Sequence, residues 1–187
     1  MFEYVTESIV LAVEPRKEYD LTADLFTRDL GRLKARVVSG RKILSKFSSH
    51  LNPLNLVSVR LVEKKQFTIT DVLTADNFSG LRNHGENYST ALNFLNIVKI
   101  LVPFSVPDIH LWHFLRASFE DNTIDCSSLL KILGYDSQFS SCAFCFHEKT
   151  THFSLNNQIF LCSSCNVKIN TENTISISNS QSIKFII

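Results

Sequence analysis

The chain has 187 residues, of which 44% are hydrophobic and 20% charged, with a formal net charge of +1. This composition supplies enough apolar surface for a folded core, which excludes the disordered, collagen-like and low-complexity classes. No run of about 18 apolar residues occurs, so the sequence predicts no membrane span. The N-terminus carries Glu3 and Glu7 and lacks a positively charged start, so we expect no signal peptide.

The N-terminal part has the residue alternation and turn chemistry of a small β-domain. Five short strands rich in Val, Ile, Thr and Phe are predicted. They are Ile9–Val13, Leu21–Thr27, Arg32–Val37, Val57–Leu61 and Phe67–Leu73. Asp29-Leu30-Gly31 has the composition of a turn. A closed barrel would remove the exposed edges of so small a sheet, so the sequence favours a five-stranded barrel.

After Asp76 the apolar spacing becomes helical. The predicted elements are a helix over Ala91–Val102, a second over Leu111–Ala117 capped by Asp108, and a third over Leu129–Leu133 capped by Ser127 or Ser128 and closed by Gly134. The tail, Ile175–Ile187, alternates Ile with Ser and is expected to be a strand or loosely ordered. We therefore expect an α+β fold with a barrel domain over residues 1–77 and a helical domain over 78–187.

Positive charge is concentrated near the barrel. Residues 28–65 contain ten basic and two acidic side chains, whereas residues 66–187 contain seven basic and ten acidic ones. Such an asymmetry suits a polyanionic partner, and a solvated charged face is the alternative. Aromatic residues near this charge are Tyr19, Phe26 and Phe47. Any of the three could stack bases, although core packing is the simpler role for Phe26.

The most specific chemical pattern is Cys142-x2-Cys145 followed, after sixteen residues, by Cys162-x2-Cys165. Two such turns joined by a hairpin, here around Asn156-Asn157, bring four thiolates into the tetrahedral arrangement that Zn²⁺ prefers. The sequence therefore predicts one structural zinc ion in an element over about 142–165. Four thiolates leave no open position for catalysis.

Other roles for these residues stay open at the level of sequence. Two disulfides or an iron–sulfur cluster are the alternatives to zinc, and His147 or His152 could replace a sulfur ligand. Cys126 is expected to be a small buried hydrophobe. No phosphate-binding Gly-rich loop, Gly-x-Ser-x-Gly or His-Glu-x-x-His motif occurs, and His110 and His113 share a helix face without a partner nucleophile. We therefore expect a protein that is not an enzyme.

The ordered set of local patterns resembles the bacterial recombination mediator RecO family. The matching segments are Thr6–Leu11, Asp20–Leu33, Ser39–Lys42, Leu51–Leu54, Leu129–Tyr135 and Cys142–Cys145. The resemblance extends over about residues 4–168 and is weakest between Phe78 and Asp125. One departure lies after the second cysteine, where the family often has Gly and this chain has Phe146.

The resemblance implies an oligonucleotide-binding (OB) barrel followed by a helical domain that carries the zinc element. It also implies binding of single- and double-stranded DNA, strand annealing, and cooperation with RecR and the single-stranded-DNA-binding protein in the bacterial cytoplasm, at the nucleoid. The four cysteines match the family's zinc ligands. The residues expected to contact DNA are Arg28, Arg32, Lys34, Arg36, Arg41, Lys42 and Lys46.

Two other functions remain compatible with the sequence. The first is a protein-interaction adaptor in which the zinc hairpin docks a partner and the basic residues only keep the barrel soluble. The second is an RNA-binding barrel, because basic charge and strand pattern do not distinguish RNA from DNA. Binding of DNA and RNA oligomers of equal length would separate these possibilities.

Overall fold

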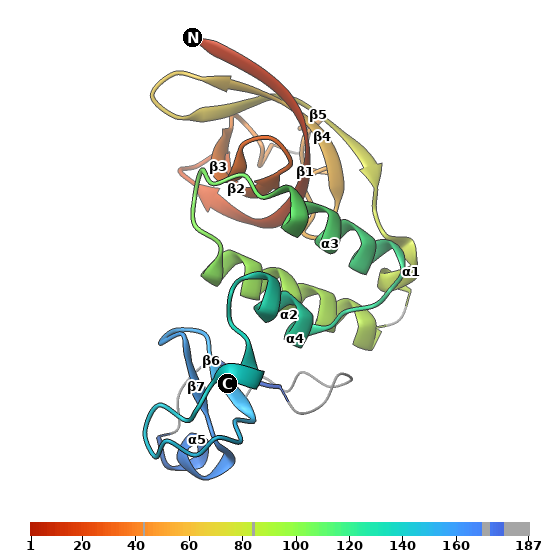
Figure 1. Cartoon of the computed structure of the whole chain (residues 1–187). Helices are drawn as coiled ribbons and strands as arrows, with labels where there is room; N and C mark the ends of the chain where they lie inside the picture. The colour runs from red at the N-terminus through yellow and green to blue at the C-terminus, as the bar shows by residue number, and fades with distance from the viewer. Residues whose placement is uncertain (43, 84, 170–172, 178–187) are drawn as a thin grey trace.

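A closed five-stranded barrel forms the N-terminal part of the fold (Figure 1). The computed structural model describes residues 1–42, 44–83, 85–169 and 173–177. The strands are β1 (Phe2–Arg16), β2 (Asp20–Thr27), β3 (Gly31–Val37), β4 (Leu56–Glu63) and β5 (Phe67–Asp76). They close in the order β1-β2-β3-β5-β4, with β3 and β5 parallel and the other pairs antiparallel. The OB-type barrel expected from the sequence is confirmed.

Alternation decides which side chains fill the barrel. On β3, Leu33, Ala35 and Val37 are buried inside, whereas Lys34 on the opposite face is exposed. β1 is longer than the predicted strand because it pairs with β4 from Phe2 onward and then with β2. The register shifts between Val10 and Ala12, and a bulge of this kind bends a strand so that it can serve both partners.

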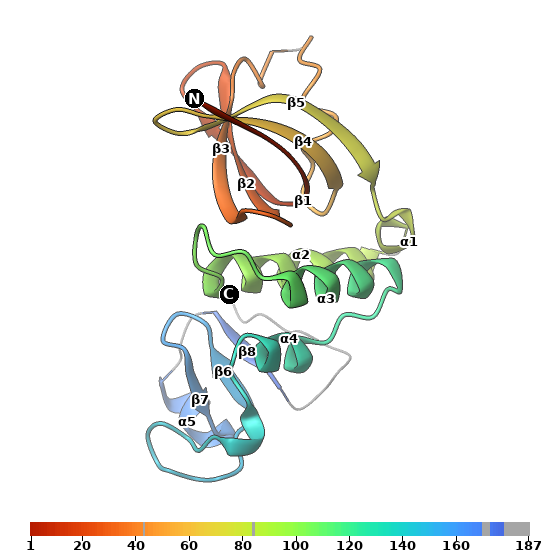
Figure 2. The ribbon, with the colours of Figure 1, turned by 45° about the horizontal axis from the view of Figure 1, so that its top comes forward.

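Helices lie beneath the barrel, and Figure 2 shows α2 and α3 side by side between the barrel and the C-terminal part. The helices between the barrel and the cysteines in the sequence are α1 (Ser79–Arg82), α2 (Gly85–Leu101), α3 (Ile109–Glu120) and α4 (Cys126–Ile132), and Figure 2 shows α4 beside β8 (Thr174–Ser176). The Asp108 cap is confirmed, since its carboxylate accepts a hydrogen bond from Leu111 N at 2.9 Å. No helix in the described ranges is long and apolar enough to cross a membrane.

Two details of the helical prediction are wrong. The N-cap of α4 is Asp125, whose carboxylate accepts from the backbone N–H groups of Ser127 and Ser128, so neither serine is the cap. A carboxylate reaches two free N–H groups of the first turn at once and also interacts favourably with the helix dipole. The first predicted helix also begins earlier than expected, because α2 starts at Gly85 and not near Ala91.

The C-terminal part is a small module around the cysteines. It contains the 3-10 turn η1 (Ser137–Phe139), the strands β6 (His152–Ser154), β7 (Ile159–Leu161) and β8 (Thr174–Ser176), and the helix α5 (Ser163–Ile169). The strands form a sheet in the order β7-β6-β8. The predicted hairpin is therefore present, and β8 makes the first residues of the tail a strand, while residues 178–187 lie outside the described residues.

Two large buried clusters organise the packing, beside a small third one at the cysteines. One lies inside the barrel, and the other runs from the outer face of the barrel through the helices to the cysteine module. Phe26 of β2 belongs to the second cluster, with its ring centroid 6.1 Å from that of Trp112 on α3, and Phe153 of β6 extends that cluster into the module. The barrel and the helices thus share a core, and the division of the chain into domains at residue 77 stays a prediction.

A buried arginine fixes the barrel on the helices. Arg32 of β3 forms a double hydrogen bond with the Asp24 carboxylate of β2, through Nε at 3.0 Å and Nη2 at 2.8 Å. Its Nη1 donates to the carbonyl oxygens of Lys99 and, at 3.0 Å, of Val102, at the end of α2. One side chain therefore binds the partial negative charge at a helix C-terminus and a buried carboxylate at the same time.

Replacing Arg32 with methionine should strongly destabilise the fold, because Asp24 would stay buried without a counter-charge. The expected loss is about 3–5 kcal/mol of unfolding free energy, measured by urea denaturation. Lys34→Met, on the exposed face of the same strand, is the matched control and should change stability by no more than about 0.5 kcal/mol. Equal stabilities for the two variants would contradict the role given to Arg32.

Candidate metal centre and nucleic-acid interface

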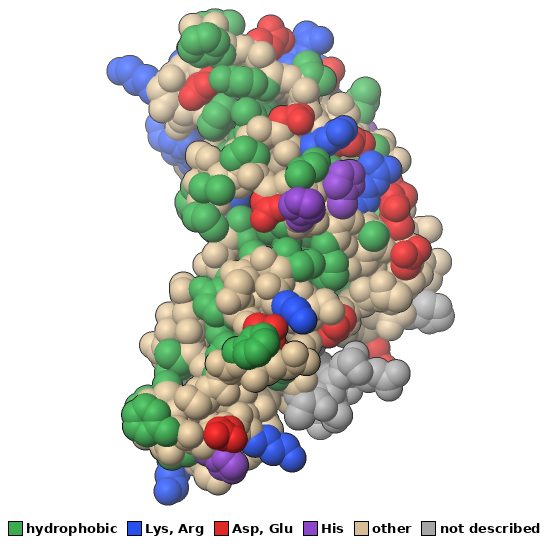
Figure 3. All heavy atoms as spheres, viewed as in Figure 1, with side chains coloured by type: hydrophobic (Ala, Val, Ile, Leu, Met, Phe, Trp, Pro, Cys, Tyr) green, Lys and Arg blue, Asp and Glu red, His purple; other side chains and the backbone are tan. Residues whose placement is uncertain are grey.

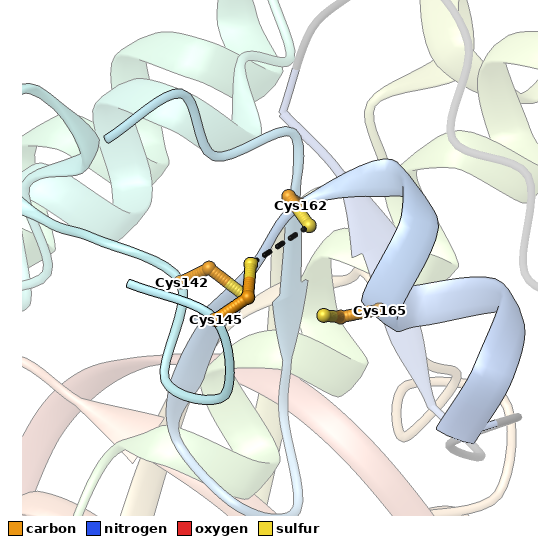
Figure 4. A group of neighbouring side chains, drawn as sticks. All are labelled: Cys142, Cys145, Cys162 and Cys165. Carbon is orange, nitrogen blue, oxygen red and sulfur yellow. Dashed lines mark hydrogen bonds between the residues drawn. The ribbon is translucent and has the colours of Figure 1, made fainter. Parts of the chain in front are cut away.

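Four cysteine side chains point toward a common centre in the C-terminal module (Figure 4). Cys142 and Cys145 lie in the loop after η1, Cys162 follows β7, and Cys165 lies in α5. Their sulfur atoms all lie within 4.8 Å of one another, and the Cys145 and Cys162 sulfurs are 3.6 Å apart. A tetrahedral site with Zn–S bonds of about 2.3 Å has sulfurs about 3.8 Å apart. The donor set and its spacing therefore fit one metal ion.

The loop that carries the first two cysteines is closed by its own backbone. Cys142 N donates to His147 O and Phe146 N donates to Cys142 O, each at 2.9 Å. Phe146 has a φ of 59°, the left-handed conformation that glycine adopts without strain. The position where related proteins were expected to have Gly thus keeps a backbone that favours Gly, at a cost of about 1 kcal/mol for the side chain.

The sulfurs are arranged to share negative charge. Burial alone would raise the pKa of the Cys142 thiol, but hydrogen bonds from the backbone N–H groups of Cys145, Cys162 and Phe144 outweigh burial and lower the pKa to about 6. Hydrogen bonding with Cys145, followed by burial, raises the pKa of Cys165 to about 12. One thiolate is therefore stabilised among neighbouring thiols, and a bound cation would stabilise the remaining thiolates.

The alternatives for these residues can now be compared with the geometry. All five cysteines are free, and a separation of 3.6 Å is far longer than an S–S bond of about 2.05 Å. Among the described residues, the one group able to hold a metal ion contains the four cysteines and neither His147 nor His152. Cys126 is buried, and its burial raises the pKa to about 12, so it is the unreactive hydrophobe that was predicted.

We expect the intact chain to carry one metal ion and to lose it when two ligands are removed. The double variant Cys162→Ser, Cys165→Ser should retain no stoichiometric metal by plasma mass spectrometry, whereas Cys126→Ala should retain one equivalent. The buried cluster around the sulfurs is small, with Cys142, Leu161 and Cys162 as its buried members, so chelation should also speed amide exchange in this part of the module. Full metal content in the double variant would contradict this assignment.

Four of the predicted DNA-contacting side chains are exposed on β3 or in the connection that follows it. Lys34 projects from β3, and Arg41, Lys42 and Lys46 follow β3 in the connection to β4. Lys42 Nζ lies 5.6 Å from the centre of the Tyr19 ring, and Lys46 Nζ lies 5.4 Å from that of Phe47. We call Lys34, Arg36, Arg41, Lys42 and Lys46 the basic surface; Arg36 is a partly exposed member that is also paired with Asp20.

The two remaining residues are placed elsewhere. Arg32 is buried by its contacts with Asp24 and α2, so we leave it out of the basic surface. Arg28 is exposed in the turn between β2 and β3, where its guanidinium lies 3.8 Å from Glu7. Since β3 rises about 3.3 Å per residue, its seven residues separate Arg28 from Arg41 by more than the length of a side chain. The structure therefore does not bring Arg28 together with the loop cations.

The aromatic candidates differ in the same way. Phe26 is fully buried, which confirms its expected role in the core, whereas Tyr19 is 51% exposed and Phe47 is partly buried. Tyr19 therefore has a ring available to solvent beside Lys42.

The two histidines that share a helix face, His110 and His113, are exposed on α3. Figure 3 shows histidine side chains beside acidic and basic ones over this helix.

Asp20 was missed by sequence reasoning, although it organises the basic surface. Its carboxylate accepts from Ser39 N at 2.9 Å and from Arg36 Nε at 2.8 Å. The backbone hydrogen bond from Ser39, then that from the Arg36 side chain, lower the pKa of Asp20 below 3.8. Asp20 therefore holds the start of the basic loop against β2. The sequence did contain a signal for this role, because Asp20 begins the strand that precedes the basic strand Arg32–Val37 and would pair with it.

The contribution of Asp20 to stability should depend on pH. Because folding lowers its pKa, the contribution is present above about pH 4 and is lost as the pH falls through the lower folded value. We expect Asp20→Asn to be less stable than the parent at pH 7, with the difference shrinking as the pH falls below about 4. Urea denaturation across this range measures it, and a difference independent of pH would contradict the assignment.

The fold combines an OB-type barrel, a helical part and a four-cysteine module, and comparison with known proteins shows which family has this arrangement. The family model "Recombination protein O N terminal" matches residues 1–78. DNA repair protein RecO of Thermodesulfovibrio yellowstonii is 29% identical over 175 residues, covering 87% of this chain and 70% of its own. The protein of the same name from a Nocardioides strain is 30% identical over 182 residues, covering 88% and 75%.

A third relative, DNA repair protein RecO of Dehalococcoides mccartyi, is 27% identical over 191 residues and aligns with 94% of this chain. These matches extend across the barrel, the helices and the cysteine module. The chain belongs to the RecO family. The family resemblance noted from the sequence is thereby confirmed, and it places the chain among proteins of DNA repair and recombination.

Proposed function

We propose that the chain is a recombination mediator that binds single- and double-stranded DNA through the basic surface and acts without chemical catalysis. The observation that carries this proposal is the exposure of Lys34 on β3, and of Arg41, Lys42 and Lys46 in the connection that follows it, in a RecO-family chain. Cations that neutralise phosphates release condensed counterions, which gives affinity without sequence preference. Binding of this kind allows two complementary strands to meet and anneal.

The wider role is the one that the resemblance to the RecO family implies. We propose that the chain works with RecR and with the single-stranded-DNA-binding protein, in the cytoplasm at the nucleoid, so that recombinase loads at gaps. Residues 1–77 form the DNA-binding domain in this proposal, and residues 78–187 form the helical domain with the metal element.

The ion that we propose for Cys142, Cys145, Cys162 and Cys165 is Zn²⁺. Four thiolate ligands within 4.8 Å favour a tetrahedral, soft-ligand site. With every coordination position filled by sulfur, the ion would stabilise the fold of the module and provide no site for substrate. The module residues themselves then have a structural role, holding β7, α5 and the loop after η1 together.

Binding of a labelled single-stranded DNA of roughly 30 nucleotides should weaken steeply with salt. Four or five phosphate contacts predict a log–log slope of about −3. The double variant Arg41→Glu, Lys42→Glu should bind every sequence more weakly, about tenfold or more, with a slope shallower by about 1.4. Fluorescence anisotropy across a salt series measures both quantities.

The matched control is Lys149→Glu with Lys168→Glu, which changes the net charge equally but lies in the cysteine module, where both lysines are exposed. This control should keep nearly the parent affinity. If both double variants lost affinity equally, total charge and not the basic surface would determine binding. If Arg41→Glu, Lys42→Glu bound as tightly as the parent, the proposed surface would be wrong.

A second candidate function is protein docking by the cysteine module. It is favoured by exposed apolar side chains around the metal ligands, Phe144 at 55% and Phe146 at 76% exposure, with Val167 nearby in sequence to Cys165. Rigid exposed aromatic residues are common anchors of protein interfaces. This function predicts negligible DNA affinity even at low salt, so the same titration separates it from the first proposal.

A further inference from the structure

An exposed aromatic ring lies where the helical layer meets the barrel. Phe104 is in the connection between α2 and α3, and it is 48% exposed although apolar. Figures 1 and 2 both place this connection against the beginning of β3, and hydrophobic side chains are exposed at this level in Figure 3. The contacts of Phe104 explain why it is held there.

The backbone on both sides of Phe104 is fixed on β3. Phe104 forms a parallel bridge with Arg32, and Ser105 N donates to Arg32 O at 2.8 Å. The connection lies so close to β3 that a Cβ atom at Gly31 would collide with the carbonyl of Val106. Ser105 has a φ of 60°, a left-handed conformation that is unfavourable for a residue other than glycine. Ser105 lies between two exposed apolar residues, Phe104 and Val106.

The ring itself is also oriented. The Arg32 guanidinium lies over it, with Cζ 4.1 Å from the ring centroid. The guanidinium is held in its buried position by hydrogen bonds to Asp24 and to the carbonyl oxygen of Val102. A buried cation therefore covers one face of the Phe104 ring, so the solvent-exposed part of the ring is its other face and its edge. A ring fixed in this way loses little conformational entropy when a flat group stacks on it.

The position of the ring relates it to the basic surface. Arg32, Lys34 and Arg36 project from the same face of β3, at intervals of about 6.6 Å. Phe104 covers the first of these positions, Lys34 is exposed at the second, and the loop with Arg41 and Lys42 follows the end of the strand. An aromatic platform at one end of a row of cations is the arrangement that binds single strands, since cations hold the backbone while rings stack the bases.

We propose that Phe104 stacks an unpaired nucleobase of single-stranded DNA whose phosphates lie along Lys34 and the rest of the basic surface. The inference rests on the proposed DNA-binding function and adds a platform contributed by the helical layer. It gives the chain a preference for unpaired strands, because a base within a duplex has no free face to offer the ring.

The test is anisotropy titration of the full chain with a single-stranded oligonucleotide and with a duplex of equal length. Phe104→Leu, which keeps apolar bulk but removes the ring, should weaken single-strand binding by roughly 5- to 150-fold. The salt slope should be unchanged, because no charge is lost, and duplex affinity should stay within about twofold of the parent. Phe104→Trp should retain the parent affinity, and Val106→Ala is the neighbouring apolar control.

The outcomes separate this inference from the proposed function. If the parent binds with a steep salt slope but Phe104→Leu binds single strands as well as the parent, the platform is wrong and the basic surface stands. The stacking role would also be wrong if Phe104→Leu lost affinity for single strand and duplex equally, or if Phe104→Trp bound single strands more weakly than the parent. Either result would indicate a packing role or a protein-docking role for Phe104. If the parent binds no DNA at low salt, both proposals fail.

Discussion

The buried pair between Arg32 and Asp24 is the interaction on which the arrangement of the molecule depends. A charged pair taken out of water is stabilising only when its remaining hydrogen-bonding groups are also satisfied. Here the rest of the guanidinium is satisfied by carbonyl oxygens of Lys99 and Val102, which are free because α2 ends there. Arg32 of β3 and the C-terminal end of α2 therefore satisfy each other's hydrogen-bonding groups, and each would have unsatisfied groups without the other.

This constraint connects packing with the proposed function. Because the connection from α2 to α3 is held on β3, the second core cluster can run continuously from Phe26 through Trp112 to Phe153 of the cysteine module. The basic surface then occupies the part of the barrel that the helices do not cover. A metal ion bound by the four cysteines would fix the module at the far end of the same core. The metal site would then contribute to the stability of the fold without contacting DNA.

Much of this organisation could be predicted from sequence, and the failures have specific physical causes. Alternation in Arg32–Val37 correctly separated the buried Leu33 and Ala35 from the basic face, and the spacing of the four cysteines predicted their convergence. Periodicity cannot tell whether the outer face of a strand meets water or another element, so Arg32 was expected to contact DNA although the α2–α3 connection covers it. Asp20 and Asp24 were missed because their partners lie across the sheet, and Phe104 because its support comes from a strand about seventy residues earlier.

The most direct test of the central claim is hydrogen–deuterium exchange of the full chain with and without a single-stranded oligonucleotide at low salt. Binding through the basic surface predicts slower exchange in peptides covering residues 17–20, 34–42 and 44–49, with the cysteine module at residues 140–169 unchanged. Protection confined to the module, with no change around β3 and the loop that follows it, would contradict the account, because DNA would then contact the cysteine module and not the basic surface.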